Sequence, residues 1–216
     1  MFIFPGSIYA ITPDQTDTEV LLGQVRAALT AGIRLIQYRD KTSNLTTRLS
    51  RGRALIRLCR DFDAQLVIND DVVLAMETGA AGVHLGSDDG SIRDARRLLP
   101  ANSIIGASCY NDLSLARSAL ANGASYVAFG ACFDSPTKPA ARRISPDQLL
   151  SFRESLGPEV AICGIGGITR DNVAEIRGLV DAVALISELF GTSTQPMTPE
   201  QIADRLRQLQ AEPALL

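Results

Sequence analysis

The chain has little of what several protein classes require. It has one histidine, His84, so a histidine-rich metal site or a histidine-centred nucleophile triad is excluded. Its four cysteines are too sparse for a disulfide scaffold and too widely spaced for a zinc ribbon, which fits a reducing cytoplasm. It has no signal-peptide pattern and no apolar run of about 18 residues. The net charge of −3 provides no basic field for nucleic acid or an anionic membrane, so we expect a cytoplasmic protein that binds neither.

Short apolar runs do recur along all 216 residues, with amphipathic stretches between them. The runs predict strands at residues 7–11, 33–38, 65–68, 82–84, 104–107, 126–128, 160–163 and 182–185. The stretches predict helices at residues 16–30, 45–62, 72–78, 92–98, 112–121, 146–156, 170–178 and 199–209. Eight βα units favour a single α/β domain over residues 1–216, a (β/α)₈ TIM barrel with residues 210–216 as a disordered tail. An open, doubly wound sheet is the alternative, although no G-x-G-x-x-G follows the first strand.

Three of the predicted helices end at a glycine before the next strand begins. These glycines are Gly32, Gly79 and Gly123, and they lie in segments that form a weak internal repeat. Glycine suits the left-handed backbone conformation that closes a helix. We therefore expect a positive φ at all three positions.

Polar side chains lie at alternate positions at the end of the second predicted strand and just after it. In a barrel the carboxyl ends of the strands face the active site, so residues just after each strand are the candidates. Gln37, Arg39 and Lys41 share one face if the chain stays extended. The planar guanidinium and the lysine point charge suit the oxygens of a diphosphate. A solvated charged loop is the alternative for this motif taken alone.

Aspartates follow the third and fourth predicted strands, which are neighbours in a barrel. They are Asp70 and Asp71 after the third strand, and Asp88 and Asp89 after the fourth. Carboxylates near a diphosphate indicate Mg²⁺, which needs only one or two protein carboxylates besides water and phosphate oxygens. We expect one of Asp70 and Asp71 to cap the next helix instead.

Further along, the fourth and fifth strands carry residues with less specific signals. His84 lies on an apolar strand, which is more typical of a packed, hydrogen-bonded histidine than of a general base. Ser108 offers a hydroxyl to an anion at the end of the fifth strand. Cys109 has no cation near it in sequence and is interpreted as a small core residue.

The last three strands end in segments that suit a phosphorylated substrate. The loop after the sixth strand carries hydroxyls, prolines and Lys138, and its length predicts a lid. After the seventh strand, Gly166 and Gly167 let the backbone approach a ligand closely. In many barrels a phosphate binds at the loops after strands seven and eight, so we expect a phosphate site there.

Eight short motifs occur in order and at barrel-like spacing. They are YAIT, QYRDK, INDD, GVHLGSDD, IIGAS, FGACFDSPTK, GIGGIT and ALIS. With these motifs the chain resembles the thiamine phosphate synthase family over about residues 9–209. The resemblance implies a transferase that condenses hydroxymethylpyrimidine diphosphate with a thiazole phosphate, carboxylated or not, to give thiamine phosphate and diphosphate. Its expected partners are these small molecules, and a homo-oligomer is left open.

The resemblance also implies roles for individual residues. The implied pyrimidine diphosphate contacts are Gln37, Tyr38, Arg39, Asp40, Lys41, Asn69, Ser108 and Lys138. The implied thiazole phosphate contacts are Ser135, Pro136, Thr137, Gly167, Ile186 and Ser187. The implied ligands of the Mg²⁺ cofactor are Asp70 and Asp89.

The chemistry implied by the resemblance is a dissociative substitution. Diphosphate leaves, the aminopyrimidine ring stabilises the resulting cation, and the thiazole nitrogen captures it. The residues assigned to catalysis are Arg39, Lys41, Lys138 and Ser108. Together with Mg²⁺ they would stabilise the charge that develops on the leaving diphosphate.

The chain departs from the family pattern at a few positions. Ser87 stands where many members have glutamine, and Ser135 stands where threonine is common. Cys109 and Tyr110 replace a commoner Thr-His pair. The alternatives to a synthase are a thiazole tautomerase-like paralogue and a non-catalytic barrel that binds a phosphorylated ligand. Neither alternative needs the aspartate pair that this chain retains.

Overall fold

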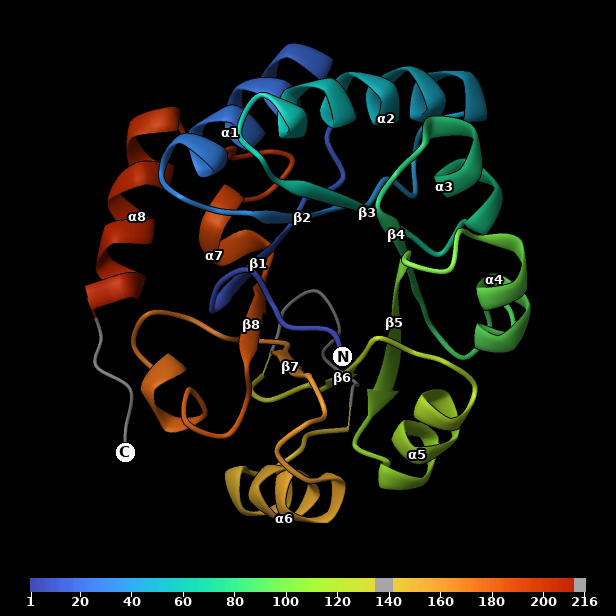
Figure 1. Ribbon diagram of the computed structural model, residues 1–216. Coiled ribbons are helices and arrows are strands. Elements are labelled where there is room, and N and C mark those ends of the chain that lie inside the picture. The colour runs from blue at the N-terminus through green and yellow to red at the C-terminus, as the bar shows by residue number, and fades with distance from the viewer. Residues whose placement is uncertain (135–141, 212–216) are drawn as a thin grey trace.

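The computed structural model describes residues 1–134 and 142–211, and within them eight central strands are surrounded by helices (Figure 1). The strands are β1 Ile8–Ile11, β2 Leu35–Tyr38, β3 Gln65–Asn69, β4 Gly82–Leu85, β5 Ile104–Tyr110, β6 Tyr126–Phe129, β7 Ile162–Ile165 and β8 Ala182–Leu185. The helices are α1 Thr18–Thr30, α2 Leu45–Arg60, α3 Val72–Thr78, α4 Ile92–Leu98, α5 Leu113–Ala121, α6 Pro146–Leu156, α7 Ser187–Phe190 and α8 Pro199–Ala211. A single 3₁₀ turn, η1, covers Val173–Glu175.

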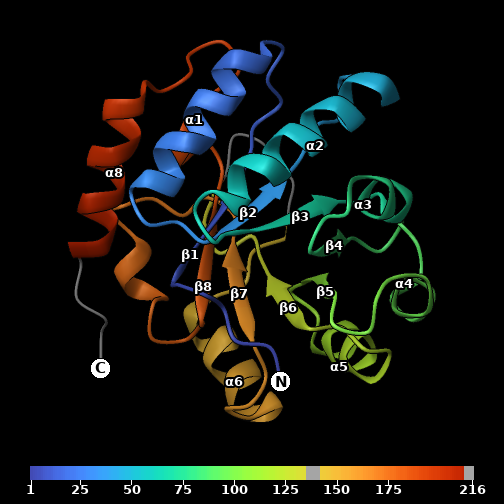
Figure 2. The same cartoon turned by 45° about the horizontal axis from the view of Figure 1, so that its top comes forward.

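The strands are parallel and close into a barrel in sequence order. Closure is made by β8, which pairs back with β1, for example at Tyr9 and Ala184. The predicted TIM barrel is therefore confirmed, and the open sheet, in which the first and last strands do not close a ring, is excluded. In Figure 2 the helices enclose the strands, and α1 and α8, from opposite ends of the chain, lie side by side.

Side chains along each strand alternate between two apolar cores. Tyr9 and Ile11 belong to the core inside the barrel, whereas Ile8 and Ala10 pack in the layer between strands and helices. At the amino end of the barrel, the segment before β1 adds aromatic rings to the inner core. The centroids of Phe2 and Phe4 lie 5.7 and 5.0 Å from the ring of Tyr126. This end of the barrel is thus packed with aromatic side chains.

Helix ends follow the signals expected from the sequence. Gly32, Gly79 and Gly123 have φ angles of 101°, 72° and 97°, so the predicted left-handed conformation is confirmed. The predicted boundaries of α3, α4 and α6 agree with the structure residue for residue. At α6 the local reason is clear, because Ser145 and Gln148 form a capping box.

Two segments differ from the expected pattern. The helix predicted for residues 170–178 is wrong, because only η1 forms there. Val173 and Ile176 are the buried apolar residues of this segment, and one 3₁₀ turn is enough to bury side chains three positions apart. At the end of the chain, α8 runs through Ala211, two residues into the expected tail, and residues 212–216 lie outside the described part. None of the described helices is long and apolar enough to cross a membrane.

Candidate active site at the carboxyl end of the barrel

Side chains at the end of β2 point alternately into the barrel and toward the surrounding helices. Inside the barrel, the amide of Gln37 donates to the hydroxyl of Tyr9 at 2.9 Å. Tyr38 belongs to the outer core, and its hydroxyl donates to the carboxylate of Asp40 at 3.0 Å. Arg39 continues toward the end of β1, where it pairs with an aspartate. The alternation expected from the sequence is therefore present at Gln37 and Tyr38.

Asp40 forms a buried ion pair with Arg51 of α2, at 2.9 Å, with both side chains at most 3% exposed. Its other oxygen accepts hydrogen bonds from the backbone N–H groups of Thr42 and Ser43. Burial opposes ionisation, but the hydrogen bonds from Ser43, Thr42 and Tyr38 outweigh it and hold the pKa of Asp40 at about 2. The carboxylate thus fixes the loop after β2, and direct substrate contact by Tyr38 and Asp40 stays a prediction.

Asp14, which follows β1, was not expected at the site. Its carboxylate accepts from Nη1 of Arg39 at 2.6 Å and from the backbone N–H of Lys41 at 2.7 Å. It therefore holds the guanidinium of Arg39 and the backbone of Lys41, the two residues that were assigned to the diphosphate. The available signal was its place just after a strand, because Asp14 follows the YAIT motif at the carboxyl end of β1.

Asp70, Asp89 and Lys41 converge between the ends of β2, β3 and β4. The ammonium of Lys41 lies 3.0 Å from Oδ2 of Asp70, and Asp89 accepts from the backbone N–H of Gly86 at 2.8 Å. Partial burial raises the pKa of Asp89, and the neighbouring carboxylate of Asp70 raises it further. Both carboxylates lie at the same rim of the barrel, and their role as metal ligands stays a prediction.

The neighbouring aspartates have other partners. Asp71 caps α3 by accepting from the backbone N–H of Leu74 at 2.8 Å, which confirms that one of the pair serves as a cap. Asp88 is exposed and accepts from the hydroxyl of Ser87 at 3.2 Å. After β3 and after β4, one aspartate thus lies at the site, and the other caps a helix or is exposed to solvent.

A cavity of about 350 Å³ opens beside this acidic group. Its lining residues are Asp40, Lys41, Ser43, Arg48, Asn69 and Asp70. Arg48 of α2 was not expected here, since no strand-end signal marks a residue in the first turns of a helix. Its guanidinium lies 3.3 Å from Asp71, so it adds a second cation to a cavity that already contains Lys41. The two cations and the Asn69 amide can bind the oxygens of a polyanion, and the Asp70 carboxylate can bind a metal ion that accompanies it.

The only histidine is packed and hydrogen-bonded, as predicted. Nδ1 of His84 lies 2.8 Å from the hydroxyl of Tyr126, and Nε2 lies 2.9 Å from the hydroxyl of Ser108. Burial lowers the pKa of His84 to about 4, although the charge of Asp70 acts in the opposite direction. Cys109 is also buried, which raises the pKa of its thiol to about 12 and supports its interpretation as a core residue.

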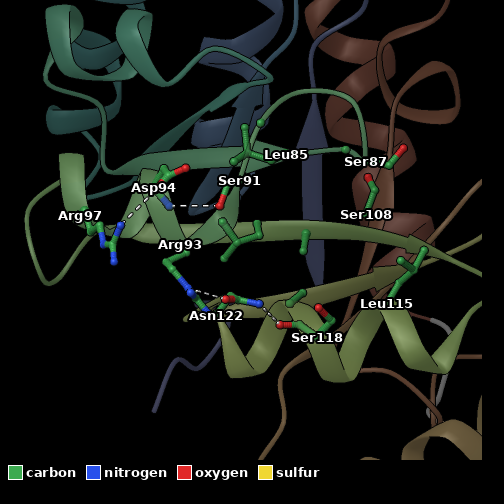
Figure 3. A pocket seen from close by; sticks show the side chains of 15 residues that line it. Leu85, Ser87, Ser91, Arg93, Asp94, Arg97, Ser108, Leu115, Ser118 and Asn122 are labelled. Atoms are coloured by element: carbon green, nitrogen blue, oxygen red, sulfur yellow. Dashed lines mark hydrogen bonds and ion pairs between the residues drawn. The ribbon is translucent and has the colours of Figure 1, made fainter.

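A second cavity, of about 540 Å³, lies between α4 and α5 (Figure 3). Ser108 and Ser87 lie at the end of it that meets the barrel mouth, and Arg93 and Asn122 lie between the helices, joined by a hydrogen bond of 2.9 Å. Two of the family departures meet at this end. The hydroxyls of Ser87 and Tyr110 are 3.1 Å apart, so the two unusual residues form one contact.

The far side of the rim is built from the ends of β6, β7 and β8. Gly167 has φ 65°, and a Cβ atom there would lie 2.3 Å from the backbone oxygen of Asp134, so only glycine fits. Within residues 1–134 and 142–211, no acceptor is found for the backbone N–H groups of Gly167 and of Ser187, which begins α7 after Ile186. Free N–H groups of this kind can bind a phosphate. The remaining predicted site residues, Ser135, Pro136, Thr137 and Lys138, lie outside the described part of the chain.

Comparison with known proteins identifies the family. The sequence model described as thiamine monophosphate synthase matches residues 8–189. The thiamine-phosphate synthase of Thiobacillus denitrificans is 45% identical over 214 residues, which cover 99% of each chain. The chain belongs to the thiamine-phosphate synthase family. Another thiamine-phosphate synthase, from Marinobacter nauticus, is 50% identical over 191 residues, covering 88% of this chain and 84% of its own.

A solved structure agrees with this assignment to the thiamine-phosphate synthase family. The thiamine phosphate pyrophosphorylase of Pyrococcus furiosus superposes with a TM-score of 0.80 at 32% identity, covering 94% of this chain and 93% of its own. The resemblance found in the motifs and the expected enzyme class are therefore confirmed. The roles of single residues remain predictions that rest on the geometry described above.

Proposed function

We propose that this chain joins hydroxymethylpyrimidine diphosphate to a thiazole phosphate, giving thiamine phosphate and releasing diphosphate. The observation that carries the proposal is the convergence of Lys41, Asp70 and Asp89 at the barrel mouth. A cation and two carboxylates next to a cavity suit a metal-bound diphosphate. The N–H groups of Gly167 and Ser187, which have no acceptor within residues 1–134 and 142–211, suit a second, phosphorylated substrate on the same rim.

The substitution that we propose is dissociative, with departure of diphosphate as the demanding step. Asp14 holds the guanidinium of Arg39 and the backbone of Lys41, so both cations are placed beside the cavity before negative charge grows on the leaving group. Ser108 contributes a hydroxyl, and Lys138 is proposed to contribute a further charge. The phosphate anchor on the other side holds the thiazole nitrogen close to the reacting carbon, which supplies proximity.

The residues at the mouth suit Mg²⁺. Asp70 and Asp89 provide hard oxygen donors; burial and then the neighbouring Asp70 raise the pKa of Asp89, and a divalent cation would favour the ionised form of both carboxylates. Within the described residues no group of three or more histidine, cysteine, aspartate or glutamate side chains is placed to hold a metal ion. Mg²⁺ usually keeps several waters and binds one or two carboxylates together with substrate phosphate oxygens. When bound, the ion would neutralise charge on the diphosphate. Asp70 and Asp89 would hold it there, while Lys41 pairs with the remaining charge.

The tautomerase-like and non-catalytic alternatives are tested by the same experiment. Purified protein is incubated with both substrates and Mg²⁺, and the products are analysed by mass spectrometry. We expect thiamine phosphate and diphosphate in equal amounts, and neither product when one substrate or the metal is omitted. Isomerisation of the thiazole without condensation would favour the tautomerase, and binding without any product would favour the non-catalytic barrel.

A further inference from the structure

Arg48 and Arg51 lie one turn apart on α2 but use their guanidinium groups differently. An arginine side chain offers five N–H donors. Those of Arg51 donate to the carboxylate of Asp40, to the hydroxyls of Thr18 and Ser43, and to the backbone oxygens of Gln15 and Thr16. Within the described residues the only acceptor of Arg48 is Asp71, 3.3 Å from Nη1, and the buried Nε has none. Arg48 therefore keeps donors that a ligand can use.

Stability does not account for Arg48 at this position. The first turn of α2 contains no acidic residue, and the helix dipole disfavours a cation there. The pair with Asp71 is partly exposed on both sides and contributes little. Asp71 does not depend on the pair either, because its Oδ1 caps α3 while only its Oδ2 reaches Arg48. What Arg48 does provide is a positive wall to the cavity of about 350 Å³, which it shares with Lys41.

The unpartnered Nε of Arg48 indicates what kind of ligand this wall suits. A buried donor without an acceptor costs free energy. Nε is covered by protein in this conformation, so a small rotation of the guanidinium toward the cavity is needed to satisfy it. After that rotation, Nε and one Nη group can donate side by side to two oxygens of one phosphate, the geometry in which arginine binds phosphate best.

The place of α2 around the barrel decides which phosphate of the substrate lies there. In a closed barrel of eight strands in sequence order, the gap between β2 and β3 is opposite the gap between β6 and β7. Figure 1 shows α2 beside β2 and β3, on the other side of the barrel from β7 and α6. The reacting carbon must lie near the thiazole, whose phosphate is proposed to bind after β7 and β8. The diphosphate attached to that carbon then extends toward β2 and β3, with its terminal phosphate closest to α2.

We propose that Arg48 binds the terminal phosphate of the pyrimidine diphosphate and thereby selects the diphosphate over the monophosphate. The proposal rests on the function proposed above. It adds a residue of α2 to a site otherwise assigned to strand ends and the loops after them. A pyrimidine monophosphate carries only the phosphate next to the pyrimidine, so it does not reach Arg48.

Calorimetry with the two pyrimidine ligands tests this assignment without turnover. Hydroxymethylpyrimidine diphosphate and hydroxymethylpyrimidine monophosphate are each titrated into the protein with Mg²⁺ and no thiazole phosphate. Arg48→Gln should weaken binding of the diphosphate by about tenfold and leave binding of the monophosphate unchanged. Equal weakening of both ligands, or unchanged binding of the diphosphate, would overturn the proposal.

Three further variants separate direct binding from a structural role. Arg53→Gln removes an exposed cation from the same helix, so binding of both ligands should be unchanged. Asp71→Asn keeps a capping side chain and leaves Arg48 without its partner, so binding of the diphosphate should not weaken. A loss in Asp71→Asn as large as that in Arg48→Gln would show that Arg48 only supports α3. Arg48→Lys keeps the charge without the planar fork and should bind the diphosphate with intermediate affinity, which also tests the proposal if Arg48→Gln does not fold.

Failure of this inference is distinguishable from failure of the proposed function. A wild-type protein that forms thiamine phosphate, together with an Arg48→Gln variant that binds the diphosphate equally well, would contradict only the role of Arg48. A wild-type protein that forms no thiamine phosphate from the two substrates would contradict the proposed function, whatever the binding measurements on Arg48→Gln.

Discussion

Two ion pairs on neighbouring parts of the rim differ in their surroundings. Asp40 and Arg51 are both almost completely buried, with several further hydrogen bonds, whereas Lys41 and Asp70 are 54% and 28% exposed. A buried pair has no water to replace a lost partner, so it fixes structure. A half-exposed pair contributes little to stability and can exchange its partner for a ligand. We infer that the first pair shapes the loop after β2 and that the second is available for chemistry.

The largest effect is expected from Asp40→Asn, which keeps the shape of the side chain but leaves Arg51 buried without a counter-charge. The free energy of unfolding, measured with urea at pH 7, should fall by about 3–5 kcal/mol. Asp14→Asn is the matched control, since it breaks the partly exposed pair with Arg39 and should cost less than about 1 kcal/mol of stability while lowering activity. Similar losses of stability in the two variants would contradict the distinction between the pairs.

The pH dependence of stability provides a second measurement on Asp40. Its pKa of about 2 in the folded protein is below the usual value, so its stabilising contribution is fully present above about pH 4. That contribution should be lost as the pH falls through the range between the two pKa values. Asp40→Asn should lack this part of the acid sensitivity, and urea unfolding at several pH values below 5 would detect the difference.

Asp70→Asn and Asp89→Asn are expected to have the next largest effect, on activity and not on folding. Each removes a negative charge proposed to hold Mg²⁺, so turnover should fall by at least about a hundredfold at fixed Mg²⁺. The far-UV circular dichroism spectrum should remain that of a folded barrel. Asp88→Asn is the control, because Asp88 is exposed and should be nearly silent. Unchanged turnover of the wild-type protein in EDTA would contradict the metal assignment.

Phe4→Ala tests the amino end of the barrel, where packed aromatic side chains lie away from the proposed substrate-binding residues. Phe4 is buried against Tyr9 and Tyr126, so its removal should lower the free energy of unfolding by about 2 kcal/mol. At temperatures where the variant is folded, kcat should change little. A large loss of kcat in fully folded protein would show that the two ends of the barrel are coupled.

The smallest effect is expected from Gly167→Ala at the far side of the rim. The new Cβ would meet the backbone of Phe133 and Asp134, and the positive φ disfavours alanine, so the turn must shift. Binding of thiazole phosphate, measured by calorimetry, should weaken by about tenfold, while binding of the pyrimidine diphosphate is retained. Equal weakening of both ligands would show that the rim is divided differently.

Much of the fold could be predicted because its signals are local. The boundaries of α3, α4 and α6 follow from capping side chains and from apolar spacing within a few residues. Residues 170–178 have a similar pattern but form only η1, since two buried side chains there need no more than one turn. The barrel packing, and not the propensity of the segment, determined its length.

The candidate site was predictable only in part. Position at or just after a strand end was enough to select Gln37, Arg39 and Lys41 and the aspartates after β3 and β4, because parallel strands deliver their carboxyl ends to one rim, whereas the choice of Asp70 and Asp89 among those aspartates came from the family resemblance. The same rule applied to β1 would have included Asp14. No such rule points to Arg48 or Arg51, which reach the rim from α2.

The sequence by itself determined the order of strands and helices, the rim residues and the family, since each depends on residues close together in the chain. Only the tertiary structure decided which of them meet. Asp40 forms an ion pair with Arg51, and Asp70 forms one with Lys41. The hydroxyl of Tyr126 donates to that of Tyr9 across 117 positions of sequence. Such contacts depend on barrel closure and on strand register, because these bring side chains from distant strands to within hydrogen-bonding distance around one axis.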